Sequence, residues 1–125
     1  MILGTGIDLV EVARIRQAVE RFGDRFLRRV LCEEEKAYCL ANKDPMPFVA
    51  ARFAAKEAIS KAFGTGIGRQ LGWLDMEVRH HESGAPYLEL HGDGARLLTE
   101  RGGRVVHLSL SHTTQHATAV AILES

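Results

Sequence analysis

The sequence predicts an α+β fold in which an N-terminal strand and several helices are followed by a largely antiparallel sheet. In the first half, apolar residues recur three and four positions apart, which is the helical period. In the second half, apolar and polar residues alternate, as in half-buried strands. No internal repeat or linker-like segment interrupts the 125 residues, so we expect one domain covering residues 1–125.

The N-terminal part predicts one strand and three short helices. The strand is Ile2–Ile7, and helical spacing of apolar residues begins at Val12. A second helix is expected over Asp24–Leu31, and the acidic run Glu33–Glu35 is typical of the first turn of a third. Cys32 stands where a serine or threonine cap is usual, which leaves the start of that third helix open.

The clearest helix in the sequence is Phe48–Phe63, which contains neither glycine nor proline and precedes Gly64, a typical C-terminal cap. At about 100° per residue, its apolar and polar residues fall on opposite arcs. Phe53 projects from the polar arc, so we expect a ligand, a loop or another subunit to cover it. The rest of the polar arc consists of Arg52, Lys56, Glu57, Ser60 and Lys61.

The C-terminal half predicts two pairs of strands around one helix. Turn residues at 83–86 and at 112–116 separate the members of each pair. Asp93 stands at the start of the intervening helix as its expected cap. The predicted strands are Leu74–Val78, Tyr87–His91, Val106–Leu110 and Ala117–Leu123, and the predicted helix is Asp93–Arg101.

Composition argues against several classes of protein. The formal net charge is zero and the pI is about 7.0, which does not favour binding to nucleic acid. Cys32 and Cys39 form no Cys-x-x-Cys pair and are expected to be reduced thiols, which fits a cytoplasmic protein. We find neither a leader-like N-terminus nor the roughly 20 apolar residues that a membrane span needs.

Two pairs of charged residues have both a functional and a structural interpretation. Asp8, after the first strand, is placed to bind a cation, but Asp8 and Glu11 also have the spacing of a helix capping box. Glu57 and Lys61 lie one helical turn apart, so a solvated ion pair explains them without any ligand. Local sequence alone favours the structural interpretation in both cases.

Glycines and histidines suggest further sites. The loop Gly64–Gly68 is a candidate anion nest beside Lys61, although a helix cap and a turn also explain it. His112 follows a predicted strand and is either a hydrogen-bond donor to a phosphate or a turn residue. Together with His107 and His116 it is also a candidate zinc ligand, but the three do not have a standard ligand spacing.

Two motifs in order carry a family resemblance. Gly6-Ile7-Asp8 and Phe53-x-x-Lys56-Glu57-Ala58-x-x-Lys61 resemble the signatures of the 4′-phosphopantetheinyl transferase superfamily, also in their separation. The stretches around the second motif, 52–58 and 61–68, look like its short, single-domain bacterial branch, the holo-acyl-carrier-protein synthases. The strand at 74–78, Gly84-x-Pro86 and Ser109-x-Ser111-His112-Thr113 extend the similarity over nearly the whole chain.

This resemblance implies a fold, an activity and an assembly. The fold would be that of a 4′-phosphopantetheinyl transferase. The activity would be Mg²⁺-dependent transfer of 4′-phosphopantetheine from coenzyme A to a serine of apo-acyl carrier protein. This reaction gives holo-carrier and adenosine 3′,5′-bisphosphate and supports fatty acid biosynthesis. Short members are homotrimers with active sites between subunits.

The resemblance also reverses the local interpretations of the charged residues. Asp8 and Glu57 match the Mg²⁺-binding positions, and Lys61 matches the lysine beside the transferring phosphate. Glu57, acting directly or through a metal-bound water, is also the expected general base for the carrier serine. The phosphates of coenzyme A would be bound by Arg52, Lys56, Lys61, Gly64, Gly66 and His112.

The first two helices carry a local excess of arginine in a neutral chain. Acyl carrier proteins are acidic, so we expect this surface to dock the carrier, with Arg14 and Arg21 as the leading candidates. Two rival functions remain open for Asp8, Glu57 and Lys61. One is a Mg²⁺-dependent nucleotide hydrolase, and the other is a nucleotide-sensing or protein-interaction module without turnover.

Overall fold

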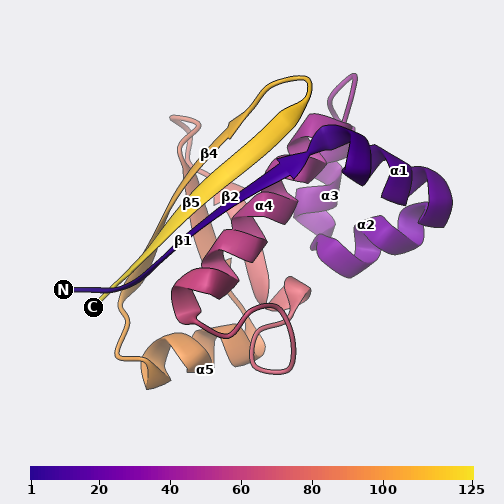
Figure 1. Cartoon of the computed structure of the whole chain (residues 1–125). Helices are drawn as coiled ribbons and strands as arrows, with labels where there is room; N and C mark the ends of the chain where they lie inside the picture. Colours follow the sequence, from indigo (N-terminus) through magenta and orange to yellow (C-terminus); the bar gives the residue numbers. More distant parts are fainter.

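A central helix, α4 (Met46–Phe63), organises the computed structural model, which describes residues 1–125 (Figure 1). Before it come β1 (Ile2–Glu11), α1 (Val12–Phe22), α2 (Asp24–Val30) and α3 (Glu33–Leu40). After it come the 3₁₀ helix η1 (Trp73–Asp75), β2 (Met76–His80), β3 (Pro86–Leu90), α5 (Gly92–Glu100), β4 (Val105–His112) and β5 (His116–Glu124). No helix combines the length and the hydropathy needed to cross a lipid bilayer.

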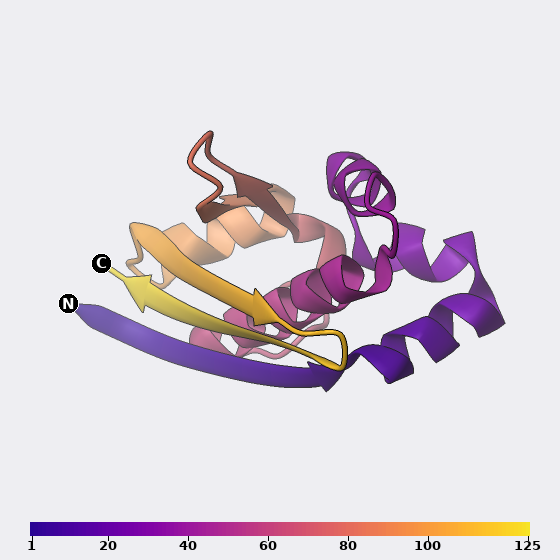
Figure 2. The same ribbon diagram turned by 90° about the horizontal axis from the view of Figure 1, so that it is seen from above.

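The strands form two separate antiparallel sheets. One has the order β1-β5-β4, and the other is the β2-β3 hairpin. Figure 2 shows α4 between the three-stranded sheet and that hairpin. The expected antiparallel pairing is confirmed, but the pairing of β1 with β5, at the other end of the chain, was not predicted. This pairing brings the two termini together, and the Ser125 N–H donates to the Met1 carbonyl at 3.0 Å.

Strand β1 packs on α4 almost backbone to backbone. A Cβ atom at Gly6 would stand 1.9 Å from the Ala58 carbonyl oxygen, and one at Gly4 would stand 2.0 Å from that of Ala62. Both distances are far shorter than a van der Waals contact, so only glycine fits at these two positions. The small alanines of α4 complete the contact. The strand therefore lies closer to the helix than larger side chains would permit.

Several element boundaries differ from those predicted. β1 continues to Glu11, which is the N-cap residue of α1, so Asp8 lies within a strand and the capping-box interpretation is wrong. α4 begins at Met46 rather than Phe48 because proline is tolerated in the first helical turn. α5 is capped by His91 rather than Asp93, and it starts at Gly92. α3 begins at Glu33 despite the unusual cap residue Cys32.

Helix α4 is enclosed, and most of its polar arc is buried. Fourteen of its 18 residues are buried, including Arg52, Lys56 and Ser60. α1–α3 and the β2-β3 hairpin enclose the side of the helix that faces away from the three-stranded sheet (Figure 2). Phe53 is covered by the same chain, since its ring lies 6.4 Å from that of Phe26 and 4.9 Å from that of Trp73. Neither a ligand nor a second subunit is needed to shield it.

An ion pair between Glu35 and Lys56 lies in the interior, and both side chains are 0% exposed. The Lys56 ammonium uses all three donors: it bonds to Glu35 Oε1 at 2.7 Å and to two backbone carbonyls, of Val30 at 2.6 Å and Trp73 at 3.0 Å. The Glu35 carboxylate also accepts hydrogen bonds from two backbone N–H groups, of Cys32 at 2.8 Å and Val78 at 2.9 Å. Such full pairing is the condition under which buried charges are tolerated.

We predict that Lys56→Met lowers the free energy of unfolding by about 3–5 kcal/mol, because it leaves a buried carboxylate without its partner. Urea denaturation followed by circular dichroism measures this change. The matched control is Lys36→Met, since Lys36 pairs with the half-exposed Asp24 and its loss should change stability far less. Equal midpoints for the two variants would show that the Glu35–Lys56 pair does not stabilise the fold.

Candidate functional site

Strand β1 and helix α4 bring three predicted site residues together. Asp8 extends from β1, while Glu57 and Lys61 lie one turn apart on α4. The Lys61 ammonium donates to Asp8 Oδ1 at 3.2 Å and to the Ile7 carbonyl at 2.8 Å. Lys61 is therefore paired with Asp8 across the β1–α4 contact, and the ion pair expected with Glu57 is not formed.

The two carboxylates of this site interact electrostatically. The pKa of Glu57 is raised, first because the carboxyl group is partly buried and then because Asp8 is negatively charged nearby; Lys61 offsets part of this effect. The Asp8 side chain remains 19% exposed and that of Lys61 51% exposed, so the site opens to solvent. Two carboxylates beside open space suit a Mg²⁺ ion, which prefers oxygen ligands and retains several waters.

Arg52 is a buried charged residue near the start of α4 and forms no ion pair with an acidic residue. Only 2% of it is exposed, and its guanidinium lies 4.3 Å from the centre of the Tyr38 ring. One terminal nitrogen donates to the Phe48 carbonyl at 3.2 Å, and the other lies 3.5 Å from His80 Nδ1. Its Nε is the one buried side-chain polar atom without a hydrogen-bond partner. This unused positive charge is compatible with the predicted role in anion binding.

The glycine loop after α4 does not form the expected anion nest. The N–H groups of Thr65 and Gly66 donate to the Ser60 carbonyl, and that of Gly64 donates to the Lys61 carbonyl. Gly64 has a φ of 79°, which is the left-handed conformation of a helix cap. These N–H groups point back to the end of α4, so they are not available to a phosphate in this conformation.

Lys56 and the histidines lie elsewhere. The ammonium of Lys56 is enclosed and fully hydrogen-bonded, so its predicted contact with phosphate disagrees with the structure. His112 is exposed at the end of β4, on the same face of the sheet as Asp8, with its ring 4.9 Å from that of Phe48. His107 lies on the opposite face and contacts Glu124 at 3.0 Å. The three histidines near the C-terminus therefore do not form a zinc site.

The arginines of α1 and α2 form a basic surface. Arg14 and Arg21 are exposed and lie seven residues apart on α1, so they project from nearly the same side of the helix. Arg16 and Arg28 are instead paired with Asp44 and Asp24. A hollow between α1 and α2 adds an apolar floor to this basic surface, and it is lined by Ala18, Phe22, Arg25, Phe26 and Arg29.

One group of donor residues was missed in the sequence. Cys32, Glu77 and His91 each bring a ligand-type atom to within 4.8 Å of the others. They come from the N-cap of α3, from β2 and from the N-cap of α5. Their wide separation along the chain matches no short motif, so only the tertiary structure brings them together.

Comparison with known proteins identifies the family of this chain. Residues 4–121 match the model of the 4′-phosphopantetheinyl transferase superfamily. The holo-[acyl-carrier-protein] synthase of Koribacter versatilis is 51% identical over 124 residues, which are 99% of each chain. The crystal structure of the Neisseria meningitidis synthase superimposes with a TM-score of 0.94 at 34% identity and covers 100% of both chains.

A second solved structure bears on the ligand. The Helicobacter pylori holo-[acyl-carrier-protein] synthase, in complex with coenzyme A, has a TM-score of 0.86 and 35% identity, and the match covers 96% of this chain and 99% of that one. Similarity of this extent in both sequence and structure leaves one assignment. The chain belongs to the 4′-phosphopantetheinyl transferase superfamily, and within it to the short holo-[acyl-carrier-protein] synthases.

Proposed function

We propose that this protein transfers the 4′-phosphopantetheine group of coenzyme A to a serine of apo-acyl carrier protein. The observation that carries the proposal is the meeting of Asp8, Glu57 and Lys61 at the β1–α4 contact, in a chain whose relatives are holo-[acyl-carrier-protein] synthases. The enzyme would act in the cytoplasm and supply holo-carrier for fatty acid biosynthesis. A hydrolase would use the same groups but would transfer to water.

Each of three side chains has a separate role in the proposed reaction. The serine oxygen of the carrier attacks the phosphorus attached to pantetheine, the bond from that phosphorus to the bridging oxygen breaks, and adenosine 3′,5′-bisphosphate leaves. Glu57, whose raised pKa makes it a stronger base than an ordinary glutamate, takes the serine proton. Lys61 holds positive charge beside the phosphates as negative charge shifts to the leaving group. Asp8 orients Lys61 by its ion pair.

Asp8 and Glu57 are also the residues that would hold Mg²⁺. When bound there, the ion would neutralise charge on the pyrophosphate of coenzyme A. The raised pKa of Glu57 supports this role, because burial and the neighbouring carboxylate of Asp8 both make an uncompensated negative charge costly. Arg52, with its unpaired Nε, and the exposed His112 are the remaining candidates for binding the nucleotide phosphates.

The basic surface of α1 and α2 is the proposed docking site for the carrier. Arg14 and Arg21 offer exposed charge that forms no ion pair within the chain, and Phe22 and Phe26 supply an apolar hollow beside it. An acidic amphipathic helix is complementary to both properties. The surface lies at one end of the molecule, far from α5 (Figure 1).

We also propose a homotrimer. The face of the three-stranded sheet that points away from α4 carries uncovered apolar side chains: Ile7 is 66% exposed and Leu9 67% exposed. Val120 stands opposite Ile7 and continues this surface on β5. Exposed apolar patches of this kind mark interfaces. Lys61 is next to it, since Thr5, Gly6, Ile7, Lys61 and Val120 line one hollow, so a neighbouring subunit would border the site.

The transferase reaction is tested by incubating the protein with apo-acyl carrier protein, coenzyme A and Mg²⁺ and recording the intact mass of the carrier. We expect a gain of one phosphopantetheine group and release of adenosine 3′,5′-bisphosphate. Asp8→Ala and Glu57→Gln should lower the rate by at least about 100-fold, and EDTA should stop the reaction. Glu82→Gln, at an exposed position outside the site, is the matched control. Nucleotide breakdown without a change in carrier mass would favour the hydrolase.

The docking proposal predicts that Arg14→Glu raises the KM for the carrier roughly tenfold, equivalent to about 1.4 kcal/mol, while the KM for coenzyme A stays constant. Steady-state kinetics at two salt concentrations provide the measurement, since a charge effect weakens as salt is added. Arg96→Glu on α5 is the control, because Arg96 is equally exposed but distant. The proposal fails if both variants have the KM of the unmodified protein.

The trimer proposal predicts a native mass of three chains by sedimentation equilibrium. Leu9→Lys, at an exposed position of β1, should leave the fold intact but shift the mass to one chain, and transferase activity should fall with it. Leu74→Lys is the control, since Leu74 is 49% exposed and lies outside the sheet. A native mass of 13.8 kDa for the unmodified protein would refute the trimer.

A further inference from the structure

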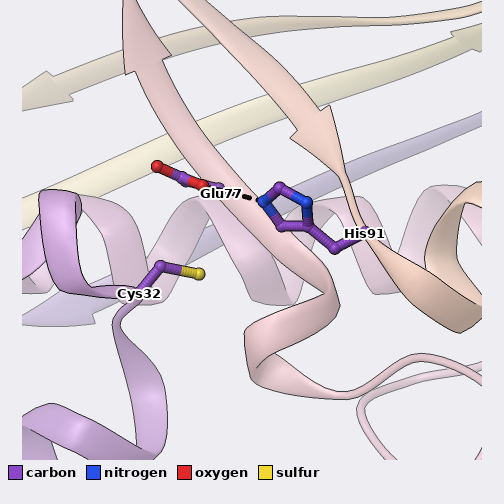
Figure 3. A group of neighbouring side chains, drawn as sticks. All are labelled: Cys32, Glu77 and His91. Atoms are coloured by element: carbon purple, nitrogen blue, oxygen red, sulfur yellow. Dashed lines mark hydrogen bonds and ion pairs between the residues drawn. The ribbon is translucent and has the colours of Figure 1, made fainter.

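The group Cys32, Glu77 and His91 lies apart from the proposed catalytic site, and Figure 3 shows the three side chains extending toward one shared space. Asp8 belongs to β1, which lies on the sheet side of α4, whereas β2 and α3 lie on the other side of that helix (Figure 2). We propose that these three residues form a second metal site, which binds a zinc-like divalent transition metal.

The donor set selects the class of metal. A thiolate, an imidazole and a carboxylate are the ligand types that Zn²⁺ takes in proteins, at bond lengths of about 2.0–2.3 Å. A hard ion such as Mg²⁺ prefers oxygen alone, so this group differs in kind from the pair Asp8 and Glu57. The three donor atoms all lie within 4.8 Å of one another. Tetrahedral coordination needs separations of roughly 3.3–3.8 Å between ligand atoms, so the thiol would move closer, while the Glu77 and His91 atoms, now 2.8 Å apart, would separate slightly.

Two of the three proposed ligands, Glu77 and His91, are already in contact. Glu77 is only 7% exposed, and its Oε1 lies 2.8 Å from His91 Nε2. The two residues are on facing parts of the hairpin, since Glu77 belongs to β2 and His91 directly follows β3. A hydrogen bond between them explains their own proximity. It does not explain why a cysteine from another part of the chain lies beside both.

Cys32 is held in place by the backbone around it. Its N–H donates to Glu35 at 2.8 Å, which fixes the residue at the start of α3. Its Sγ lies 3.7 Å from the carbonyl oxygens of Leu74 and Met76. Partial burial raises the pKa of the thiol to about 11, so in the absence of a metal the sulfur carries a proton and is a poor nucleophile. Metal binding would displace that proton.

The site would have three protein ligands and one open position. His91 is partly exposed, so water would reach the fourth position from its side. A bound ion would link the start of α3 to β2 and to the start of α5, three segments that are far apart in sequence. Since a ligand that binds only the folded state stabilises it, zinc should raise the melting temperature.

Cobalt(II) is the probe that tests the proposal. The full-length, metal-free protein is titrated with Co²⁺ and followed by absorption spectroscopy. We expect one equivalent to produce the thiolate-to-cobalt charge-transfer band and the intense visible bands of tetrahedral cobalt. Oxygen ligands alone produce neither signal, so binding at Asp8 and Glu57 does not interfere. A titration without the charge-transfer band overturns the proposal.

Variants identify the ligands. Cys32→Ser should abolish the charge-transfer band, and His91→Gln should weaken zinc affinity by more than about tenfold, because even the loss of outer-shell partners costs that much. Competition with a chromophoric chelator measures the zinc affinity. Cys39→Ala and His81→Gln are matched controls outside the group and should bind as the unmodified protein does. Because His91 is 43% exposed, its replacement should preserve the fold. Unchanged zinc affinity in His91→Gln would overturn the proposal.

Discussion

The buried ion pair between Glu35 and Lys56 connects α4 to the segments on the side of the helix that faces away from the three-stranded sheet. Through hydrogen bonds, the pair reaches the end of α2, the start of α3, η1 and β2. Each of these segments is short, and none would be stable alone. Lys56 therefore connects all four segments to α4, either directly or through Glu35. Glu57 is the next residue on that helix, so the same anchor orients a candidate catalytic side chain.

A second constraint acts on the opposite side of α4. Because Gly4 and Gly6 bring the backbone of β1 against the helix, Asp8 approaches the side chains of Glu57 and Lys61 although 48 residues separate Asp8 from Glu57. The site thus needs two kinds of packing. A hydrogen-bonded charge pair holds the helical side, and direct backbone contact holds the sheet side. Both belong to regular elements, which keep their geometry better than loops do.

Periodicity was sufficient to predict most helices and strands, because each buries one face. Periodicity predicted α4 as a helix but not the burial of its polar residues. A helix that is enclosed on all sides does not expose a polar face even when its sequence contains one. Lys56 illustrates the difficulty: its charge suggested solvent or phosphate, whereas its partner Glu35 is 21 residues away and invisible to local rules. The strand position of Asp8 was missed for a similar reason, because pairing with β5 extends β1 past Ile7, where the strand was predicted to end.

The site residues Asp8, Glu57 and Lys61 were found by the order of two motifs and not by their local chemistry, which favoured capping and ion pairing. Conversely, Cys32, Glu77 and His91 have no signature in the sequence, since three separate elements supply them.

The alanine-rich core of α4 has an effect on how this protein can evolve. Ala54, Ala55 and Ala58 are completely buried, and the glycines of β1 lie against the same helix, so no larger residue can be introduced without displacing backbone. Tolerance for substitution is therefore concentrated at the exposed end formed by α1 and α2, where the side chains have room. A lineage of such enzymes can change the partner that it recognises while its reaction centre stays fixed.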